Sequence, residues 1–147
     1  MSLPTAAAGH ETRIKVRGYH LDVYGHVNNA RHLEFLEEGR WAWFEANNDL
    51  ARFQERGWGF AVVNINIDYR RPAFMGEVLV VRSTLAKLGR RSAVIHQRVT
   101  LADTDTVVVE ADVTFVVTDR ADGRAVAIEG ELRALFAGLV ATPAADG

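Results

Sequence analysis

The stretch GYHLDVYGHVNNARHLEFLEEGRW, residues 18–41, decides the fold, because a polar loop broken by glycine passes directly into a segment with helical periodicity. Two adjacent asparagines, Asn28 and Asn29, precede the periodic segment, and asparagine is a favoured helix N-cap. These signals predict a helix over residues 30–48, with an acid, Asp22, in the loop before it.

A helical wheel of residues 30–48 has one broad apolar face, which we expect to pack on the rest of the protein. Charged side chains occupy the opposite face. The residues expected on the apolar face are Ala30, Leu33, Leu36, Trp41, Trp43 and Phe44.

Outside this helix, the chain follows the two-residue period of β-strands. Residues 11–19 alternate before the loop, and the period returns in FAVVNINIDYR, residues 60–70. In that second strand we expect one shared face for Val63, Ile65, Ile67 and Tyr69. Further strands are expected at 77–88, 92–101, 106–118 and 125–128, and a closing helix is expected at 130–139.

One long helix with four or more antiparallel strands is an α+β arrangement, a curved sheet wrapped around a single hydrophobic helix. We expect one domain over residues 11–140, between tails at 1–10 and 141–147 that are rich in Ala, Gly and Pro. The edges of such a sheet favour dimerisation, because a partner's strand can cover them.

Composition excludes several classes of function. The chain has 147 residues, a net charge of −2 and no cysteine, which removes disulfides and cysteine nucleophiles and gives no indication of a nucleic-acid partner. The three serines lie outside any G-x-S-x-G elbow, which argues against a Ser-His-Asp hydrolase. Because no apolar run is long enough for a signal peptide or a membrane span, we expect a cytoplasmic protein without membrane insertion.

Three segments together resemble the hotdog-fold thioesterases: YHLDVYGHVNNARHLEFLEEGRW at 19–41, VVNINIDYRRPA at 62–73 and AIEGELR at 127–133. The D-x-x-G-H-V-N-N element is more specific for the family than for its substrate. The resemblance implies a hotdog fold, in which antiparallel sheet encloses the helix, and a homodimer or homotetramer with active sites between subunits. It also implies hydrolysis of an acyl-CoA to a free acid and CoA, without a metal or another cofactor.

In this family the acid three residues before the loop glycine carries the chemistry, and here that acid is Asp22, before Gly25. An ionised carboxylate can take a proton from water or attack the thioester directly, and the sequence leaves both routes open. The first N–H groups of the following helix lack partners and carry partial positive charge, so we expect them to stabilise the oxyanion. Gly25 would leave room for the substrate carbonyl. The structural alternative is an Asp22 that only caps a turn.

Four other loop residues are candidates, each with an ordinary structural alternative. His26 could orient water or substrate, or it could brace the loop. Asn28 and Asn29 could contact substrate, or they could serve as caps and braces. Tyr24 could line the path of the acyl or pantetheine group, or it could simply pack against its neighbours.

The histidines of this stretch also suggest a metal site. His20, His26 and His32, together with Asp22, have spacings that could place ligands around a strand end. No second cluster elsewhere in the sequence completes such a site, so we expect no metal.

Glu37 falls among apolar positions of the helical wheel, beside Arg40. Buried charges are normally paired, so we expect an ion pair between Glu37 and Arg40. The alternative is that Glu37 is a reserve catalytic acid, since some hotdog enzymes use an acid on this helix.

Binding of the CoA phosphates requires cations. Arg90 and Arg91, with Ser92, lie in the predicted hairpin turn at 89–91, which the family often uses to contact the nucleotide end of CoA, and forked arginine contacts suit phosphate. Arg70, which ends the second strand, is a further candidate. Each of these arginines could instead be a solvated surface charge.

The expected function is therefore hydrolysis of medium- or long-chain fatty acyl-CoA. One alternative is a thioesterase that acts on acyl carrier protein, and another is a non-catalytic acyl-CoA-binding protein of the same fold. A hydratase is disfavoured because Asp22 and His26 have the spacing D-x3-H, whereas hydratases of this fold usually show D-x4-H.

Overall fold

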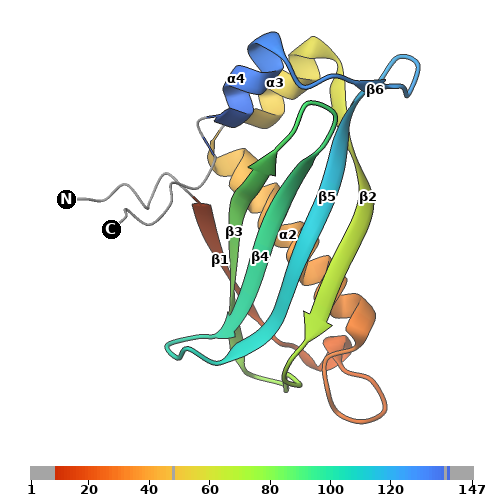
Figure 1. Cartoon of the computed structure of the whole chain (residues 1–147). Coiled ribbons are helices and arrows are strands. Elements are labelled where there is room, and N and C mark those ends of the chain that lie inside the picture. Colours follow the sequence, from red (N-terminus) through yellow and green to blue (C-terminus); the bar gives the residue numbers. More distant parts are fainter. Residues whose placement is uncertain (1–8, 48, 138, 140–147) are drawn as a thin grey trace, which may run out of the picture.

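The computed structural model describes residues 9–47, 49–137 and 139. The elements in chain order are β1 (Gly9–Lys15), the 3₁₀ turn η1 (Gly18–His20), α2 (Asn29–Ala46), α3 (Asp49–Arg56), β2 (Trp58–Tyr69), β3 (Val78–Leu88), β4 (Ala93–Leu101), β5 (Val107–Asp119), β6 (Ala125–Val126) and α4 (Gly130–Ala137). One sheet dominates the described part, with the long helix α2 along one face and the short helices α3 and α4 at one end (Figure 1). None of the described helices is both long and apolar enough to cross a membrane.

The sheet has the strand order β1-β3-β4-β5-β2, with β6 beside β5, and every neighbouring pair is antiparallel. Helix α2 runs along one face of the sheet, so the predicted α+β fold with one long enclosed helix is confirmed (Figure 1). The predicted hairpin between residues 77 and 101 is also confirmed as the β3–β4 pair. In this order β1 and β2 are the edge strands.

The strand predicted at 125–128 is shorter, Ala125–Val126, and larger differences from the predicted elements occur at two other places. The first strand begins at Gly9, inside the segment expected as a tail, and ends at Lys15. It gives way to η1, in which Arg17 N donates to Nδ1 of His20 at 2.9 Å. Residues 49–56, for which no helix was predicted, form α3. Residues 1–8 and the expected tail at 141–147 lie outside the described residues.

The face that α2 buries differs from the one predicted. The sheet covers a stripe that includes Phe35 as well as the expected Leu36, and Leu33 and Trp41 remain 37% and 46% exposed. The apolar side chains of α2 extend further around the helix than the sheet does, so a helical wheel alone cannot say which of them is covered. The buried residues of α2 are His32, Phe35, Leu36, Gly39, Trp43 and Phe44.

Close approach between α2 and the sheet requires a glycine at position 39. A Cβ at Gly39 would lie 2.7 Å from Cγ1 of Val81 on β3. Beside this contact the fully buried Gln97 of β4 donates from Nε2 to Leu36 O and to Oγ of Ser83, both at 2.9 Å. Its Oε1 accepts a hydrogen bond from Arg40 at 3.0 Å, so this buried amide is fully bonded.

The core has two parts. One lies beneath the first half of α2, around Phe35 and Leu36. The other joins the second half of α2 to the two short helices through an aromatic cluster that includes Trp43, Phe53 and Phe136. Helices α3 and α4 therefore close one end of the sheet and leave the start of α2 at the other end (Figure 1).

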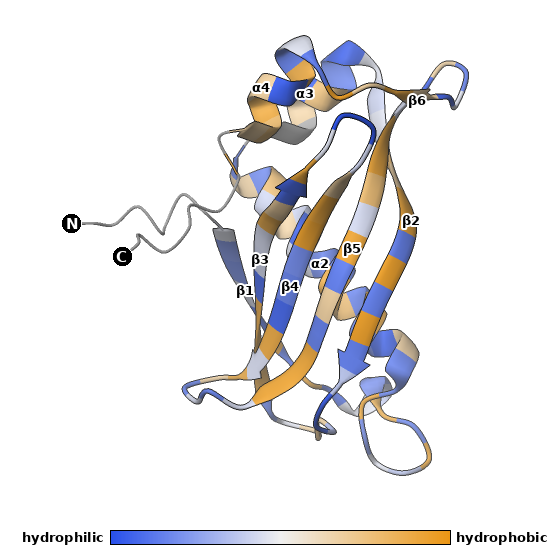
Figure 2. Cartoon of the chain, viewed as in Figure 1, coloured by the Kyte–Doolittle hydropathy of each residue, from blue (hydrophilic) through white to orange (hydrophobic). Residues whose placement is uncertain are grey.

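Edge strand β2 presents apolar side chains to solvent. Its hydropathy alternates along the strand as predicted (Figure 2), but a register shift against β5 between Val62 and Asn64 interrupts the alternation of faces. Val63 and Tyr69 are 57% and 43% exposed, whereas Ile65 and Ile67 are half-buried. The single face predicted for these four residues is therefore wrong, because the bulge turns Val63 outward.

Candidate active site

The loop between η1 and α2 is closed by backbone hydrogen bonds. Leu21 and Val27 form an antiparallel bridge. Asp22 N donates to His26 O at 2.8 Å, and Gly25 N donates to Asp22 O at 3.0 Å. Gly25 has a φ of +81°, a left-handed conformation that glycine adopts at no steric cost. Because the N–H of Gly25 is bonded to Asp22 O, it is not free to bind a substrate. The space beside Gly25 is open, since an added Cβ would meet nothing within 4 Å.

The carboxylate of Asp22 is only partly used by this turn. Oδ1 accepts a hydrogen bond from Tyr24 N at 2.9 Å, whereas Oδ2 has no partner among the described residues. The half-buried side chain lines a hollow of about 250 Å³, which we call the Asp22 hollow. Its other walls come from His26 and Val27 of the loop, from Asn29 and His32 of α2, and from residues 69–72.

The fold brings these walls together from distant parts of the sequence. The loop and the start of α2 lie beside the end of β2 at the lower end of the sheet (Figure 1). Tyr69 Oη donates to Asn29 O at 3.2 Å, which joins the end of β2 to the start of α2. Beyond the strand, Arg71 forms a forked ion pair with Glu77, with both N–O distances at 2.8 Å. The hydrogen bonds with Arg71 lower the pKa of Glu77, so Glu77 stays ionised at neutral pH and keeps the ion pair that braces this wall.

The start of α2 leaves one backbone donor beside the hollow. Of the two asparagines predicted as caps, Asn28 is the N-cap, and its Oδ1 accepts from Ala30 N at 2.8 Å. Asn28 O accepts from Arg31 N and His32 N. The N–H of Asn29 has no partner in the described part of the chain, and Asn29 lines the hollow. An unpaired N–H at a helix N-terminus stabilises a negative charge that lies close to it.

His32 is the most deeply buried polar side chain of the hollow, at 3% exposure. Its Nδ1 is buried without a hydrogen-bond partner. The ring packs edge-on against Phe35, with centroids 5.9 Å apart, and is tilted against Tyr69 at 5.8 Å. Burial lowers the pKa of His32 from 6.5 to about 4, so the imidazole is neutral at physiological pH.

A family model of the thioesterase-like superfamily matches residues 16–136, most of the chain. The chain belongs to this superfamily.

Among its relatives is the long-chain acyl-CoA thioesterase FadM of Escherichia coli (strain K12), 50% identical over 123 residues, which cover 84% of this chain and 93% of FadM. The crystal structure of the YbaW probable thioesterase from Escherichia coli has 48% identity and a TM-score of 0.83, and the match covers 88% of this chain and 98% of that one. A more distant relative is the chloroplastic acyl-acyl carrier protein thioesterase ATL3 of Arabidopsis thaliana. It is 30% identical over 81 residues, which are 52% of this chain and 41% of ATL3.

In this thioesterase-like chain, Asp22, His26 and Asn29 share one hollow, and they are joined there by Arg70. The ring of His26 also packs edge-on against Phe74, with centroids 5.2 Å apart, so the residue braces the loop as well. Arg70 lies within ion-pair distance of Asp68 and Glu110, at 3.5 and 3.4 Å.

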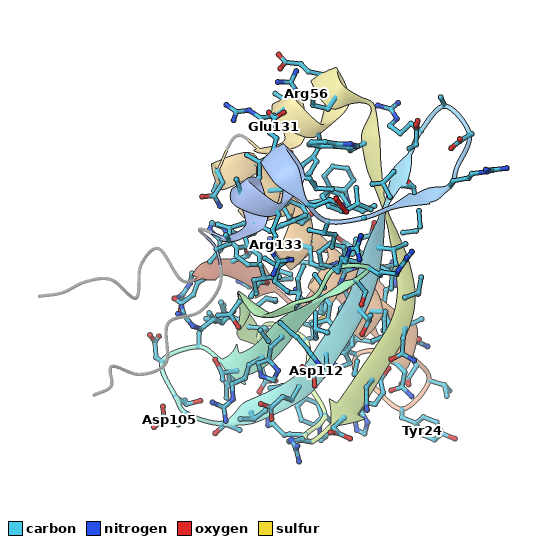
Figure 3. The ribbon with its side chains drawn as sticks, turned by 45° about the horizontal axis from the view of Figure 1, so that its top comes forward. Tyr24, Arg56, Asp105, Asp112, Glu131 and Arg133 are labelled. Atoms are coloured by element: carbon cyan, nitrogen blue, oxygen red, sulfur yellow. The ribbon has the colours of Figure 1, made fainter. Side chains whose placement is uncertain are left out.

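Tyr24 lies outside the hollow. Its side chain is 79% exposed, and Figure 3 shows it at the outer tip of the loop, pointing away from the sheet. Tyr24 is therefore not part of the wall of the Asp22 hollow.

The hairpin residues Arg90, Arg91 and Ser92 lie at the other end of the sheet from the Asp22 hollow. They come just before Ala93, the first residue of β4. The end of β2 lies at the opposite end of the sheet, because Tyr69 pairs with Val109 of β5, and Val109 pairs with Val99 near the end of β4. At about 3.3 Å per residue, the eight steps of β4 span roughly 26 Å. One chain therefore does not bring this hairpin to Asp22. Arg90 instead approaches Glu129 at 3.6 Å.

Glu37 occupies a second, separate hollow. It lies with Trp41 and Phe44 in a largely apolar depression of about 160 Å³ between α2 and β2. Its Oε2 accepts a hydrogen bond from Nε1 of Trp41 at 3.2 Å, and Arg40 donates to Gln97 instead. The predicted Glu37–Arg40 ion pair is thus replaced by these two contacts, because Gln97 reaches Arg40 from the sheet.

The structure adds residues to the site that the sequence did not single out. The sequence suggests His32 only as a metal ligand and Tyr69 only as a strand residue. The one available signal was that His32 lies three residues after Asn29, which places both on one side of a helix. In the described ranges no group of three or more His, Asp or Glu side chains is arranged to hold a metal ion, and Nδ1 of His20 is bonded within η1.

Proposed function

We propose that this chain hydrolyses medium- or long-chain fatty acyl-CoA to a free fatty acid and CoA, with Asp22 as general base or nucleophile. The observation that carries the proposal is the Asp22 carboxylate, which lies in a hollow at the start of α2 with one oxygen outside the turn's hydrogen bonds. The similarity to the Escherichia coli long-chain acyl-CoA thioesterase supports the substrate class.

In the general-base route, Asp22 takes a proton from a water molecule whose oxygen attacks the thioester carbonyl carbon. The carbonyl electron pair moves to its oxygen, and the resulting oxyanion accepts a hydrogen bond from the unpaired N–H of Asn29. Collapse of this intermediate breaks the C–S bond. The departing CoA thiolate then takes the proton from Asp22, which restores the carboxylate.

In the covalent route, Asp22 itself attacks the carbonyl and forms a mixed anhydride, which water then hydrolyses. Hydrolysis in ¹⁸O-labelled water under single-turnover conditions distinguishes the routes. The covalent route can leave ¹⁸O in Asp22, whereas the general-base route leaves the label only in the fatty acid.

The variant Asp22→Asn tests the role of this carboxylate. Asparagine keeps an oxygen for the hydrogen bond from Tyr24 N, so the loop should hold its shape. We expect thiol release from a medium- or long-chain acyl-CoA to fall by roughly 100-fold or more. The matched control is Asp105→Asn, an exposed acid on the β4–β5 turn, well apart from the loop of Tyr24 (Figure 3). Equal rates for Asp22→Asn and wild type would refute the assignment.

We further propose that the chain is a homodimer, or a pair of dimers, joined through the edge of β2. This 12-residue strand is hydrogen-bonded to β5 on one side, and an unpaired edge is a template for another strand. Beside the edge, Leu33 and Trp41 of α2 are exposed with Val63 of β2. Because residues 69–72 end this strand and line the Asp22 hollow, a partner seated here would adjoin the site.

In such a dimer we propose that Arg90 and Arg91 bind the CoA phosphates at the site of the partner subunit. The test is the double charge reversal Arg90→Glu with Arg91→Glu, which should raise KM for acyl-CoA with a smaller effect on kcat. Arg120→Glu with Arg124→Glu, at exposed positions beside the β5–β6 turn, is the matched control. An unchanged KM in the double variant would remove this hairpin from the binding site.

A second candidate function is hydrolysis of acyl groups carried by acyl carrier protein, which the similarity to the Arabidopsis enzyme favours. The comparison uses one acyl group attached to both carriers. We expect a kcat/KM at least tenfold higher for the CoA thioester, and a preference for the carrier protein would reverse the assignment. Tight acyl-CoA binding without any thiol release would identify a non-catalytic binding protein instead.

A further inference from the structure

The buried imidazole of His32 has no structural partner that accounts for it. Its Nδ1 is sealed in the protein without a hydrogen bond, and its ring is held between Phe35 and Tyr69. Buried polar groups that lack partners are rare and destabilising, and where they persist they often serve a function. A leucine or methionine at this position would avoid that cost, so packing alone does not explain a histidine here.

The ring nitrogens of His32 face different surroundings. Nδ1 is fully enclosed, whereas Nε2 has no hydrogen-bond partner in the described part of the chain and is not sealed off. His32 also lines the hollow that contains Asp22. His32 is 3% exposed, and because Nε2 is the ring nitrogen that is not enclosed, we infer that this remaining surface includes Nε2 and opens on the hollow.

The buried environment also indicates which tautomer the ring adopts. Among buried backbone groups, an N–H without an acceptor is rarer than a C=O without a donor, and we apply the same preference to the ring nitrogens. We therefore assign the proton to Nε2 and leave Nδ1 as the unpaired acceptor. The low pKa of His32, about 4, agrees with a neutral ring that carries a single N–H.

We propose that His32 is a catalytic residue of the Asp22 hollow, whose neutral Nε2–H donates a hydrogen bond to the thioester carbonyl oxygen. The inference rests on the proposed acyl-CoA hydrolysis and adds to it a side-chain donor beside the backbone N–H of Asn29. His32 and Asn29 are three residues apart on α2, so both lie on the side that lines the hollow. No proton leaves His32 during the reaction: it stabilises charge on the oxygen, while Asp22 handles the proton of water.

A neutral donor suits this position. A cation would pair with the Asp22 carboxylate in the same hollow and compete with water for it, whereas a neutral N–H leaves the carboxylate available. The arginines of the hollow are held by acids: Arg71 is paired with Glu77, and Arg70 lies near Glu110. His32 is thus a side-chain donor directed into the hollow without an ionic partner in the described residues.

The test uses two replacements of similar length and flexibility, only one of which has a donor. Glutamine can place an N–H near the position of Nε2, and methionine cannot. We expect His32→Met to lower kcat by roughly 100-fold, with less than a threefold change in KM, and His32→Gln to recover at least tenfold of that loss. The melting temperature of His32→Met should match or exceed that of wild type, since the enclosed unpaired nitrogen is removed.

A spectroscopic measurement reports on the hydrogen bond itself. In the slow Asp22→Asn protein, the infrared stretch of a ¹³C-labelled acyl-CoA carbonyl can be recorded before hydrolysis. We expect a lower frequency when His32 is present than in the double variant with His32→Met, because a donor polarises the carbonyl. If His32→Met does not fold, His32→Leu takes its place in both measurements.

Any one of three results would overturn the inference. The first is a kcat for His32→Met within threefold of wild type, and the second is an equal loss of kcat in the Met and Gln variants. The third is a carbonyl stretching frequency that is the same with and without His32. The Asp22→Asn rate separates this failure from that of the proposed function. If Asp22→Asn is slow while His32→Met is fast, only the role of His32 falls. If Asp22→Asn is as fast as wild type, the proposed site itself falls.

Discussion

His32 couples the stability of the protein to pH. Its pKa is about 4 in the folded chain and 6.5 when unfolded, so the unfolded chain takes up a proton first as pH falls. The stability that neutral His32 contributes is therefore fully present above pH 6.5 and is lost as pH falls towards 4. This shift in pKa corresponds to a loss of about 3 kcal/mol of folding stability once the pH is below both pKa values.

Between pH 7.5 and pH 4.5, we expect the free energy of unfolding, measured with urea, to fall by about 2 to 3 kcal/mol more for wild type than for His32→Met. The groups that face His32 in the hollow, Asp22, His26, Arg70 and Arg71, are present in both proteins, so their titration contributes to both curves. Parallel pH profiles for the two proteins would show that His32 is not buried as a neutral ring.

At the level of elements, the strand hairpin and the start of α2 could be predicted because their signals are local. Asn28 caps the helix through its own side chain, and the strands carry a clear two-residue period. Helix α3 could not be predicted in this way, because its segment is polar and short. Among residues 51–56 of α3, Phe53 is the buried side chain, and it packs among aromatic rings from β2 and α4, which are contacts that no local pattern contains.

The role of α3 as a clamp on the end of the sheet can be tested through that anchor. Phe53 is 2% exposed, and its ring lies 4.7 Å from that of Phe60 and 5.6 Å from that of Phe136. We expect Phe53→Ala to reduce the free energy of unfolding by about 3 to 5 kcal/mol, from lost burial and the cavity left behind. The exposed neighbour Gln54→Ala is the control and should change it by less than about 0.5 kcal/mol.

Because α3 lies at the opposite end of the sheet from the Asp22 hollow, the activity of folded Phe53→Ala should stay near that of wild type (Figure 1). If Phe53→Ala reduces the free energy of unfolding by less than about 1 kcal/mol, Phe53 does not anchor the helix. The ion pair between Arg56 and Glu131, visible at the same end in Figure 3, is exposed at both residues and serves as a poor anchor by comparison.

At the scale of the whole molecule, only half of the candidate site could be predicted from sequence. Asp22, His26 and Asn29 belong to one short stretch, so their grouping follows from the loop and the helix that it precedes. The wall formed by residues 69–72 comes from about 40 positions later, and it meets the loop only because β2 is an edge strand that ends beside the start of α2. The length of β4 separates the Arg90 hairpin from Asp22, which residue spacing could not reveal.

The edge position of β2 also leads to a prediction about assembly. Val63 projects from the bulge and is 57% exposed, so a lysine there is tolerated in a lone chain but introduces a desolvated charge into an interface across this edge. We expect sedimentation equilibrium of wild type to give a dimer or tetramer, and Val63→Lys to shift it towards monomer. Ala121→Lys, in the exposed β5–β6 turn, adds the same charge elsewhere and should leave the assembly unchanged.

Assembly and activity should fall together in Val63→Lys, because the end of β2 lines the Asp22 hollow and a partner across this edge would adjoin it. We expect kcat/KM for acyl-CoA to decrease by at least tenfold in the monomeric variant and to recover as protein concentration is raised. A variant that stays oligomeric would locate the interface elsewhere. A monomer with wild-type activity would instead show that the hollow of one chain is a complete site, with α2, the loop and residues 69–72 sufficient for hydrolysis.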